Sequence, residues 1–142
     1  MILLDTNVIS EPLKSTSAPA VLAWLDAQII SSLYVSTISL AELRFGIACL
    51  PKGKRRETLQ LNLDQRVLPL FAGRILSFDN EASTAYARLC SQARSQGQAI
   101  APSDGYIAAI ATVHGFAVAT RDTSPFEAAK LKVINPWMWT PH

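Results

Sequence analysis

The sequence "LLDTNVIS", residues 3–10, places the carboxylate of Asp5 directly after an apolar segment. Thr6 and Asn7 follow it before apolar residues resume. The segment 1–4 is predicted to be a short strand, so Asp5 marks the point at which that strand ends. A carboxylate in this position either caps the turn that follows or serves a ligand beyond the strand. The rest of the chain decides between these two roles.

The composition is typical of one compact domain that spans residues 1–142. Of the 142 residues, 49% are hydrophobic, which is enough for a substantial core. No apolar run reaches the ~18 residues of a membrane span. Asp5 and Glu11 also interrupt the start of the chain, where a signal peptide would be apolar. We therefore expect a cytoplasmic protein without membrane contacts.

Strands and helices are predicted to alternate along the chain. Hydrophobic periodicity and breaker residues predict strands at 1–4, 33–36, 74–78, 116–120 and 132–134, and helices at 19–30, 40–50, 54–71, 80–96 and 103–115. This order predicts an α/β domain in which helices cover both faces of a mainly parallel sheet of about five strands. In such sheets the ligand crevice lies beyond the carboxyl ends of the strands.

Four carboxylates stand near those predicted strand ends. Asp5 and Asp122 follow strands, Glu42 lies early in the helix after the second strand, and Asp104 opens a later helix. Each also has a purely structural explanation. Ser39 and Glu42 fit the S-x-x-E capping box, and Asp104 suits the positive end of its helix. Asp5 and Asp122 can cap the turns that follow them.

Taken together, the four acids predict a metal site. Like charges ~4 Å apart repel by about 4 kcal/mol at an effective dielectric near 20, so such a cluster takes up protons or binds a cation. The two histidines, His114 and His142, are far apart in sequence, and oxygen ligands favour Mg²⁺, or alternatively Mn²⁺, over zinc. An ion that activates water suits phosphodiester hydrolysis, and Thr6, Asn7 and Thr120 can orient its ligands or water.

Four segments in this order and spacing resemble the PIN-domain ribonucleases. They are "LLDTNVISE" (3–11), "STISLAELRFGI" (36–47), "APSDGYIAAIA" (101–111) and "FAVATRDTSPF" (116–126), and the resemblance extends over nearly the whole chain to "VINPW" (133–137). Within that family the chain is most similar to the VapC toxins of bacterial toxin–antitoxin modules, in their FitB-like branch. A D-T-N motif alone is weak evidence, whereas four acidic motifs in register are strong.

The resemblance implies a three-layer PIN fold and a Mg²⁺- or Mn²⁺-dependent endoribonuclease that cleaves RNA. It also implies a homodimer and neutralisation by a cognate antitoxin, whose C-terminal segment occupies a groove near the active site. Whether that complex binds DNA stays open. The family's acidic positions fall on Asp5, Glu42, Asp104 and Asp122. Of these, Asp5 and Asp104 are expected to bind the metal, and Glu42 and Asp122 to hold a second ion or its waters.

Six basic residues are candidates for RNA contact, and each has an alternative explanation. The run "PKGKRRE" (51–57) either binds phosphate or an acidic antitoxin segment, or forms a solvated turn between helices. Arg44 and Arg121 each stand close to a motif acid in the sequence. Each is expected either to contact substrate phosphate or to form an ordinary ion pair with that acid. The candidates are Arg44, Lys52, Lys54, Arg55, Arg56 and Arg121.

The segment 40–71 carries more apolar residues than one helical stripe requires, which suits either the core or a subunit interface.

Three other classes of protein fit the sequence less well. A haloacid-dehalogenase-like phosphatase requires a second Asp two positions after the first, where this chain has Asn7. A nucleotide-binding module requires a phosphate loop, and the six glycines form neither GxxxxGK[ST] nor GxGxxG. In a non-catalytic partner module the acids would be caps and the apolar helices would bind protein. The four intact acids argue against this third class without excluding it.

Overall fold

Five parallel strands form the central sheet of the computed structural model, which describes residues 1–141 and leaves His142 outside the described residues. The strands are β1 (Ile2–Leu4), β2 (Leu33–Ser36), β3 (Ile75–Leu76), β4 (Ala117–Ala119) and β5 (Val133–Ile134), in the spatial order β3-β2-β1-β4-β5. The chain first builds outward from β1 through β2 to β3. It then returns to the other side of β1 to add β4 and β5.

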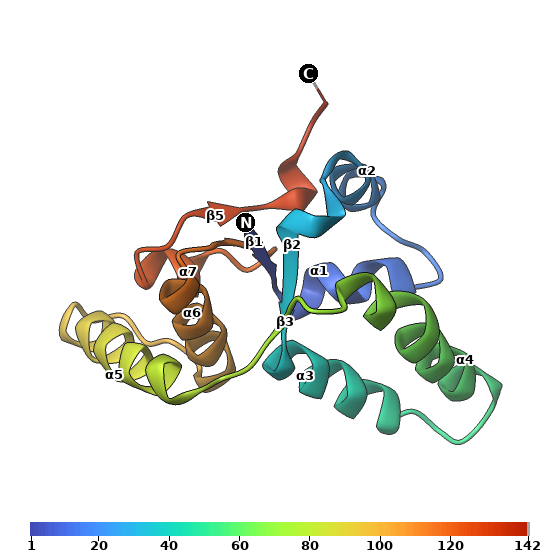
Figure 1. Ribbon diagram of the computed structural model, residues 1–142, viewed down its shortest axis with the longest axis horizontal. Coiled ribbons are helices and arrows are strands. Elements are labelled where there is room, and N and C mark those ends of the chain that lie inside the picture. The colour runs from blue at the N-terminus through green and yellow to red at the C-terminus, as the bar shows by residue number, and fades with distance from the viewer. Residues whose placement is uncertain (142) are drawn as a thin grey trace.

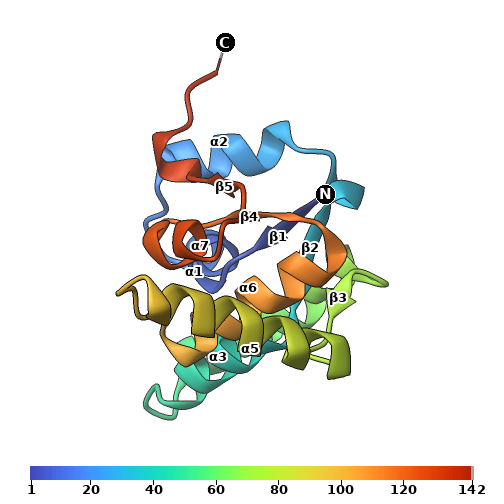
Figure 2. The same cartoon turned by 90° about the vertical axis from the view of Figure 1, so that its left-hand side faces the viewer.

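Seven helices cover the two faces of this sheet. They are α1 (Thr6–Ser10), α2 (Pro19–Ala27), α3 (Thr37–Ala48), α4 (Lys54–Asn62), α5 (Asn80–Ser95), α6 (Pro102–His114) and α7 (Ser124–Ala128). Figure 1 shows α5, α6 and α7 on one side of the sheet and α1, α3 and α4 on the other; Figure 2 looks onto the first group. The predicted three-layer arrangement is confirmed. Among residues 1–141, no helix combines the length and the apolar character that crossing a bilayer requires.

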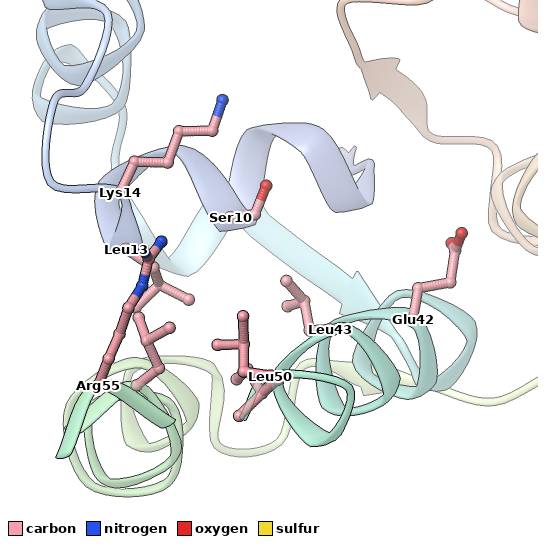
Figure 3. A pocket seen from close by; sticks show the side chains of 10 residues that line it. Ser10, Leu13, Lys14, Glu42, Leu43, Leu50 and Arg55 are labelled. Atoms are coloured by element: carbon pink, nitrogen blue, oxygen red, sulfur yellow. The ribbon is translucent and has the colours of Figure 1, made fainter. Parts of the chain in front are cut away.

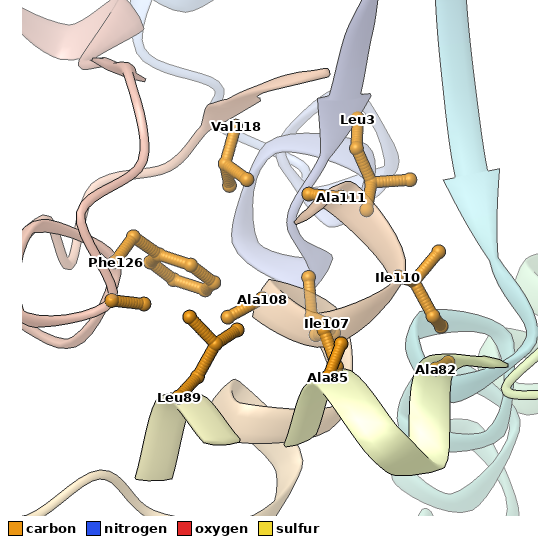
Figure 4. Packing of buried hydrophobic residues seen from close by; sticks show 12 residues of the cluster. Leu3, Ala82, Ala85, Leu89, Ile107, Ala108, Ile110, Ala111, Val118 and Phe126 are labelled. Carbon is orange, nitrogen blue, oxygen red and sulfur yellow. The ribbon is translucent and has the colours of Figure 1, made fainter. Parts of the chain in front are cut away.

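Side-chain alternation along β1 feeds two hydrophobic cores, one on each face. Leu3 packs with Val118 and with residues of α5, α6 and α7, including Phe126 (Figure 4). Leu4, the next residue, packs instead with Ala119 and with the helices on the opposite face. Because successive side chains of a strand point to opposite faces, a strand buried on both sides is apolar throughout. This explains why the segment before Asp5 is continuously apolar.

Capping residues set the ends of several helices. Asp79 caps α5 as predicted, and its Oδ1 accepts the N–H of Ala82 at 2.9 Å. Helix α3 begins three residues earlier than predicted, because Ser36 is its cap and accepts the N–H of Ser39 at 3.1 Å. The alternative explanation of Glu42, a capping box with Ser39, is therefore wrong. Glu42 lies in the second turn of α3 instead.

The segment predicted as one helix over 54–71 stays helical but changes its winding twice. Helix α4 continues into a π-helical turn (Leu63–Val67) and then a 3₁₀ turn (Leu68–Phe71). Its apolar residues divide between the core and the surface: Leu63 is 0% exposed, whereas Leu61 is 54% exposed. On the adjacent α3, Phe45 is 71% exposed. The surplus of apolar residues in this region thus lies partly on the surface.

We predict that Leu63→Ala lowers the free energy of unfolding by about 2–5 kcal/mol, because it leaves a cavity beneath the π-helical turn. Leu61→Ala, two residues away, is the matched control and is expected to change this free energy by no more than about 0.5 kcal/mol. Urea unfolding of the two variants measures both. Equal losses would contradict the division of this segment between core and surface.

Candidate active site

The site lies where the order of the strands reverses, between β1 and β4. Asp5 follows β1 directly, and its backbone N–H donates to the carbonyl of Ala119 in β4 at 2.9 Å. Asp122 lies three residues beyond the end of β4. In open parallel sheets this switch point leaves a crevice at the carboxyl edge. The sequence placed both acids at strand ends, and the strand order makes those two ends adjacent.

Asp5 is the most constrained acid of the site. It is only 5% exposed. Its Oδ1 accepts the N–H of Thr6 at 2.8 Å, and its Oδ2 accepts the hydroxyl of Thr120 at 2.8 Å. The first of these bonds caps α1, so Asp5 caps a helix and faces the site at the same time. Two fixed hydrogen bonds leave its carboxylate with one orientation.

Thr120 and Asn7 tie the end of β4 to α1. The Thr120 hydroxyl oxygen accepts the N–H of Asp122 at 3.0 Å, and the Asn7 amide donates to the same oxygen at 3.4 Å. The side-chain oxygen Oδ1 of Asn7 in turn accepts the backbone N–H of Arg121 at 3.3 Å. These contacts hold the backbone that carries Asp122 against the backbone that carries Asp5.

Glu42 reaches the site from α3 and is held by Thr6. The Thr6 hydroxyl lies 2.7 Å from Oε1 of Glu42 and 3.0 Å from the hydroxyl oxygen of Ser39. Ser39 itself contacts the helix cap Ser36. A polar chain therefore runs from the end of β2 to Glu42, whose side chain remains exposed. This position differs from that of a capping glutamate, which would reach back to its own helix terminus.

Asp104 lies in the first turn of α6, where the close approach of α5 holds the helix. Gly105 makes that approach possible, since a Cβ at this position would lie 2.7 Å from Cε2 of Tyr86 and 3.0 Å from Sγ of Cys90. The sequence contained this glycine in "SDGY", but its role depends on a contact between two helices. It could not be recognised without the packing.

The four acids line a single open hollow of about 340 Å³. The other lining residues are Thr6, Asn7 and Ser10, so every polar side chain in the lining ends in a carboxylate, a hydroxyl or an amide. Sequence reasoning missed Ser10, because α1 is only five residues long and carries no helical stripe that would predict it.

The donor set of this hollow fits a hard cation such as Mg²⁺ or Mn²⁺. The arrangement is nevertheless open: within residues 1–141, no three His, Cys, Asp or Glu side chains form a group that could hold an ion. Asp5 is fixed, whereas Glu42 and Asp122 are exposed. An ion would therefore have to draw these two side chains toward Asp5 and Asp104.

The crowding of charge raises two carboxyl pKa values in the metal-free protein. The pKa of Asp104 rises from 3.8 to about 6, chiefly through burial and then through the charges of Asp5, Asp122 and Glu42. Burial also raises the pKa of Asp5; the bonds from Thr120 and Thr6 oppose this rise, and the charges of Glu42 and Asp122 add to it. The hollow therefore favours protons or a cation over four bare charges.

The candidate RNA contacts lie in different places. Arg44 pairs with Asp64 at 2.9 Å, an acid outside the site, so the alternative in which it pairs with a motif acid is wrong. Arg121 lies with its guanidinium carbon 5.3 Å from the centroid of the Trp137 ring. Lys52 and Lys54 are exposed where the α3–α4 turn enters α4.

The two arginines at the start of α4 differ from one another. Arg55 lines a groove that ends at Glu42. Arg56 lines a separate recess between α3 and α4, together with Arg44.

The fold and this hollow define a class of protein, namely an α/β domain with an acidic, oxygen-lined cleft at the switch point of a parallel sheet. The family model described as "PIN domain" matches residues 2–131, and the chain belongs to the PIN-domain family.

Several curated relatives align over almost the whole chain. The chain is 61% identical over 137 residues to the "VapC ribonuclease Y4jK" of Sinorhizobium fredii, an alignment that covers 96% of this chain and 98% of the relative. It is 53% identical over 137 residues to the "Toxin FitB" of Neisseria gonorrhoeae, covering 96% and 99% respectively.

One solved structure described as FitAB bound to a DNA fragment has a TM-score of 0.95 and 51% identity, and the match covers 100% of this chain and 99% of that one. The family and fold that the sequence resemblance implied are therefore confirmed.

We predict that Asp104→Asn stabilises the metal-free protein. Asp104 keeps its proton in the folded state up to about pH 6, against 3.8 when unfolded, so the parent loses stability as pH rises through this window. The variant avoids that loss and should be more stable at neutral pH by roughly 1 kcal/mol, a small value because water still screens the group. Urea unfolding with chelator, on both sides of the window, measures the difference.

Millimolar Mn²⁺ provides the control for this prediction. It should stabilise the parent more than the variant, because only the parent retains the Asp104 carboxylate. Stability curves that stay parallel across pH, with and without the ion, would contradict the electrostatic account.

Proposed function

We propose that this chain is a metal-dependent endoribonuclease, the toxin of a toxin–antitoxin pair, which hydrolyses RNA phosphodiester bonds at the acidic hollow. The convergence of Asp5, Glu42, Asp104 and Asp122 on one oxygen-lined hollow carries this proposal. Its relatives support it, since one is named a ribonuclease and another a toxin. The non-catalytic alternative leaves four crowded carboxylates without a purpose.

Asp5 and Asp104 are the proposed ligands of a Mg²⁺ or Mn²⁺ ion, and Glu42 and Asp122 hold a second ion or its waters. When bound, such an ion lowers the pKa of a water molecule and neutralises charge on the phosphate. Asp5 suits its role because two hydrogen bonds fix its carboxylate. Thr6 orients Glu42.

Thr120 and Asn7 support the site from behind. The Thr120 hydroxyl donates to Asp5 and accepts from the backbone of Asp122, and Asn7 contacts the same hydroxyl oxygen. These residues set the separation between the ends of β1 and β4. They are positioning residues in this proposal, because no part of the argument brings them into contact with RNA.

Among the basic residues, Arg121 and Arg55 are the best placed to bind RNA phosphate. Arg121 follows β4 one residue before Asp122, and stacking on Trp137 orders its guanidinium. Arg55 lines the groove that leads to Glu42. Lys52, Lys54 and Arg56 are proposed only as a more distant phosphate contact, and the ion pair of Arg44 with Asp64 makes Arg44 the weakest candidate.

We predict that the protein cleaves RNA in the presence of Mg²⁺ or Mn²⁺ and that Asp5→Asn lowers the rate at least about 100-fold, because it removes one charge from the ion's ligands. Asp26→Asn is the matched control: it makes the same change on the exposed face of α2 and should leave the rate unchanged. Gel-based cleavage of labelled RNA measures all three proteins. Equal rates for parent and Asp5→Asn would refute the site; no cleavage by the parent would favour a binding module.

A groove beside the hollow is the proposed site of the antitoxin. It has a volume of about 210 Å³ and an apolar floor that includes Leu13, Leu43 and Leu50. Figure 3 shows Lys14 and Arg55 at one end and Glu42 at the other. An amphipathic peptide segment would fit such a groove, with apolar residues on the floor and acidic residues toward the basic end.

We predict that Gly46→Phe weakens antitoxin binding at least about tenfold, or about 1.4 kcal/mol. Gly46 lines the groove, and a Cβ there would have no atom from another part of the fold within 4 Å, so we expect a larger side chain to occupy the groove with little change to the fold. Gly46→Ala is the control and should bind normally while stabilising α3. Calorimetric titration with the antitoxin measures both variants, and unaltered affinity for Gly46→Phe would place the antitoxin elsewhere.

A homodimer and DNA association complete the proposal. Phe45 on α3 and Leu61 on α4 are exposed apolar side chains of the kind that a second copy of the chain would cover. A related structure is described as FitAB bound to DNA. We propose that DNA contact in this case belongs to the toxin–antitoxin complex, with the antitoxin as the DNA-binding partner.

A further inference from the structure

A second concave site lies at the opposite edge of the sheet from the acidic hollow. It has a volume of about 400 Å³ and is formed by α5, the end of α6, the start of β4 and the segment after α7. In Figure 2 these three helices face the viewer. Gly115, which precedes β4, and Ala117, which begins it, line this site, whereas the acidic hollow lies beyond the end of the same strand.

Three cations from two separate segments surround this site. Arg88 comes from α5, and Lys130 and Lys132 flank Leu131 after α7. No Asp or Glu is among the lining residues, and within residues 1–141 none of the three cations forms an ion pair. The lining also offers the amide of Gln92, whereas the Thr112 hydroxyl, which lines the site too, already donates to the carbonyl of Ala108 at 2.9 Å. Most of the other lining residues are apolar, but cations without a neighbouring acid favour an anionic ligand.

The backbone at Lys130 provides an independent observation. Lys130 has φ 63°, and it is the only residue other than glycine with a positive φ in the described part of the chain. It ends α7 in a Schellman arrangement: its N–H donates to the carbonyl of Glu127, and the N–H of Leu131 donates to that of Phe126. Glycine would fit this left-handed backbone without strain, whereas lysine costs free energy there. The chain nevertheless carries a positively charged side chain at this position.

We propose that Arg88, Lys130 and Lys132 form a second contact for the phosphate backbone of the substrate RNA; this inference rests on the proposed ribonuclease function. Ala117 and Asp122 are five residues apart along β4 and its extension, so the two sites lie within about 18 Å along this path. In this proposal a single RNA strand bound at the acidic hollow continues over the protein surface to the second site within a few nucleotides. The contact selects long RNA over short phosphodiesters without reading bases.

The decisive experiment removes the three charges in the inactive Asp5→Asn background, where RNA is bound but not cut. The triple variant R88Q/K130G/K132Q should bind a long single-stranded RNA at least about tenfold more weakly. The slope of log affinity against log salt should fall by about 2, since each lost contact with a single strand removes about 0.7. Fluorescence anisotropy across a salt series measures both quantities.

Lys130→Gly alone separates binding from folding. It relieves the left-handed backbone, so its melting temperature should stay the same or rise, while the salt slope should still fall by about 0.7. Arg66→Gln, a neutralisation at an exposed position in the π-helical turn, is the matched control and should change neither. An unchanged slope for Lys130→Gly would overturn the proposal and leave Lys130 as an ordinary helix end.

Cleavage assays in the otherwise unmodified protein distinguish this inference from the proposed function. The triple variant should raise KM for long RNA and leave hydrolysis of a small chromogenic phosphodiester unchanged, because that substrate reaches only the acidic hollow. Equal kinetics of parent and triple variant on long RNA would overturn the second contact alone. A parent that cleaves no RNA would instead refute the ribonuclease function. If the triple variant lost as much affinity for duplex DNA as for long RNA, the second site would bind nucleic acid in general, and the proposal that it serves the RNA substrate would be overturned.

Discussion

The pairing of β1 with β4 is the constraint on which the rest of the site depends. It brings Asp5, the residue after β1, beside the extension of β4 that carries Thr120 and Asp122. The Thr120 hydroxyl then bonds to the carboxylate of Asp5 and to the backbone N–H of Asp122. The same pairing places β1 at the centre of the sheet, where helices cover both of its faces, so Leu3 and Leu4 must be apolar up to the point where Asp5 begins. Fold and site therefore depend on the same three residues of strand.

The site combines one rigid acid with others that remain partly free. Asp5 is buried and held by two hydrogen bonds, whereas Glu42 and Asp122 are exposed. Their mutual repulsion opposes the collapse of the four acids into a closed cage, which agrees with the open hollow and with the raised pKa of Asp104. A cation would remove that repulsion. The repulsion among the carboxylates, which destabilises the site without an ion, would therefore also favour binding of an ion.

The sequence predicted the layers, the strands and the four acids better than the details between them. β2 is predicted to the residue because neither Pro nor Gly interrupts it and Tyr34 and Val35 favour a strand. The start of α3 was wrong because Ser36 and Ser39 are both good caps, and only the bond from the N–H of Ser39 to the Ser36 hydroxyl identifies the first as the cap. Helix α1 was missed because five residues carry no periodic signal. Gly105 and the Arg44–Asp64 pair depend on contacts between distant segments.

The acidic hollow and the apolar groove are not independent, because Ser10 and Glu42 line both of them. A peptide seated in the groove would contact the same glutamate that Thr6 orients toward Asp5. Inhibition by such a peptide then needs no conformational change carried through the sheet. It follows from occupancy alone, since one side chain cannot serve an ion and a neighbouring peptide with the same oxygens. This distinguishes the groove from the basic site at the opposite edge, which shares no residue with the hollow.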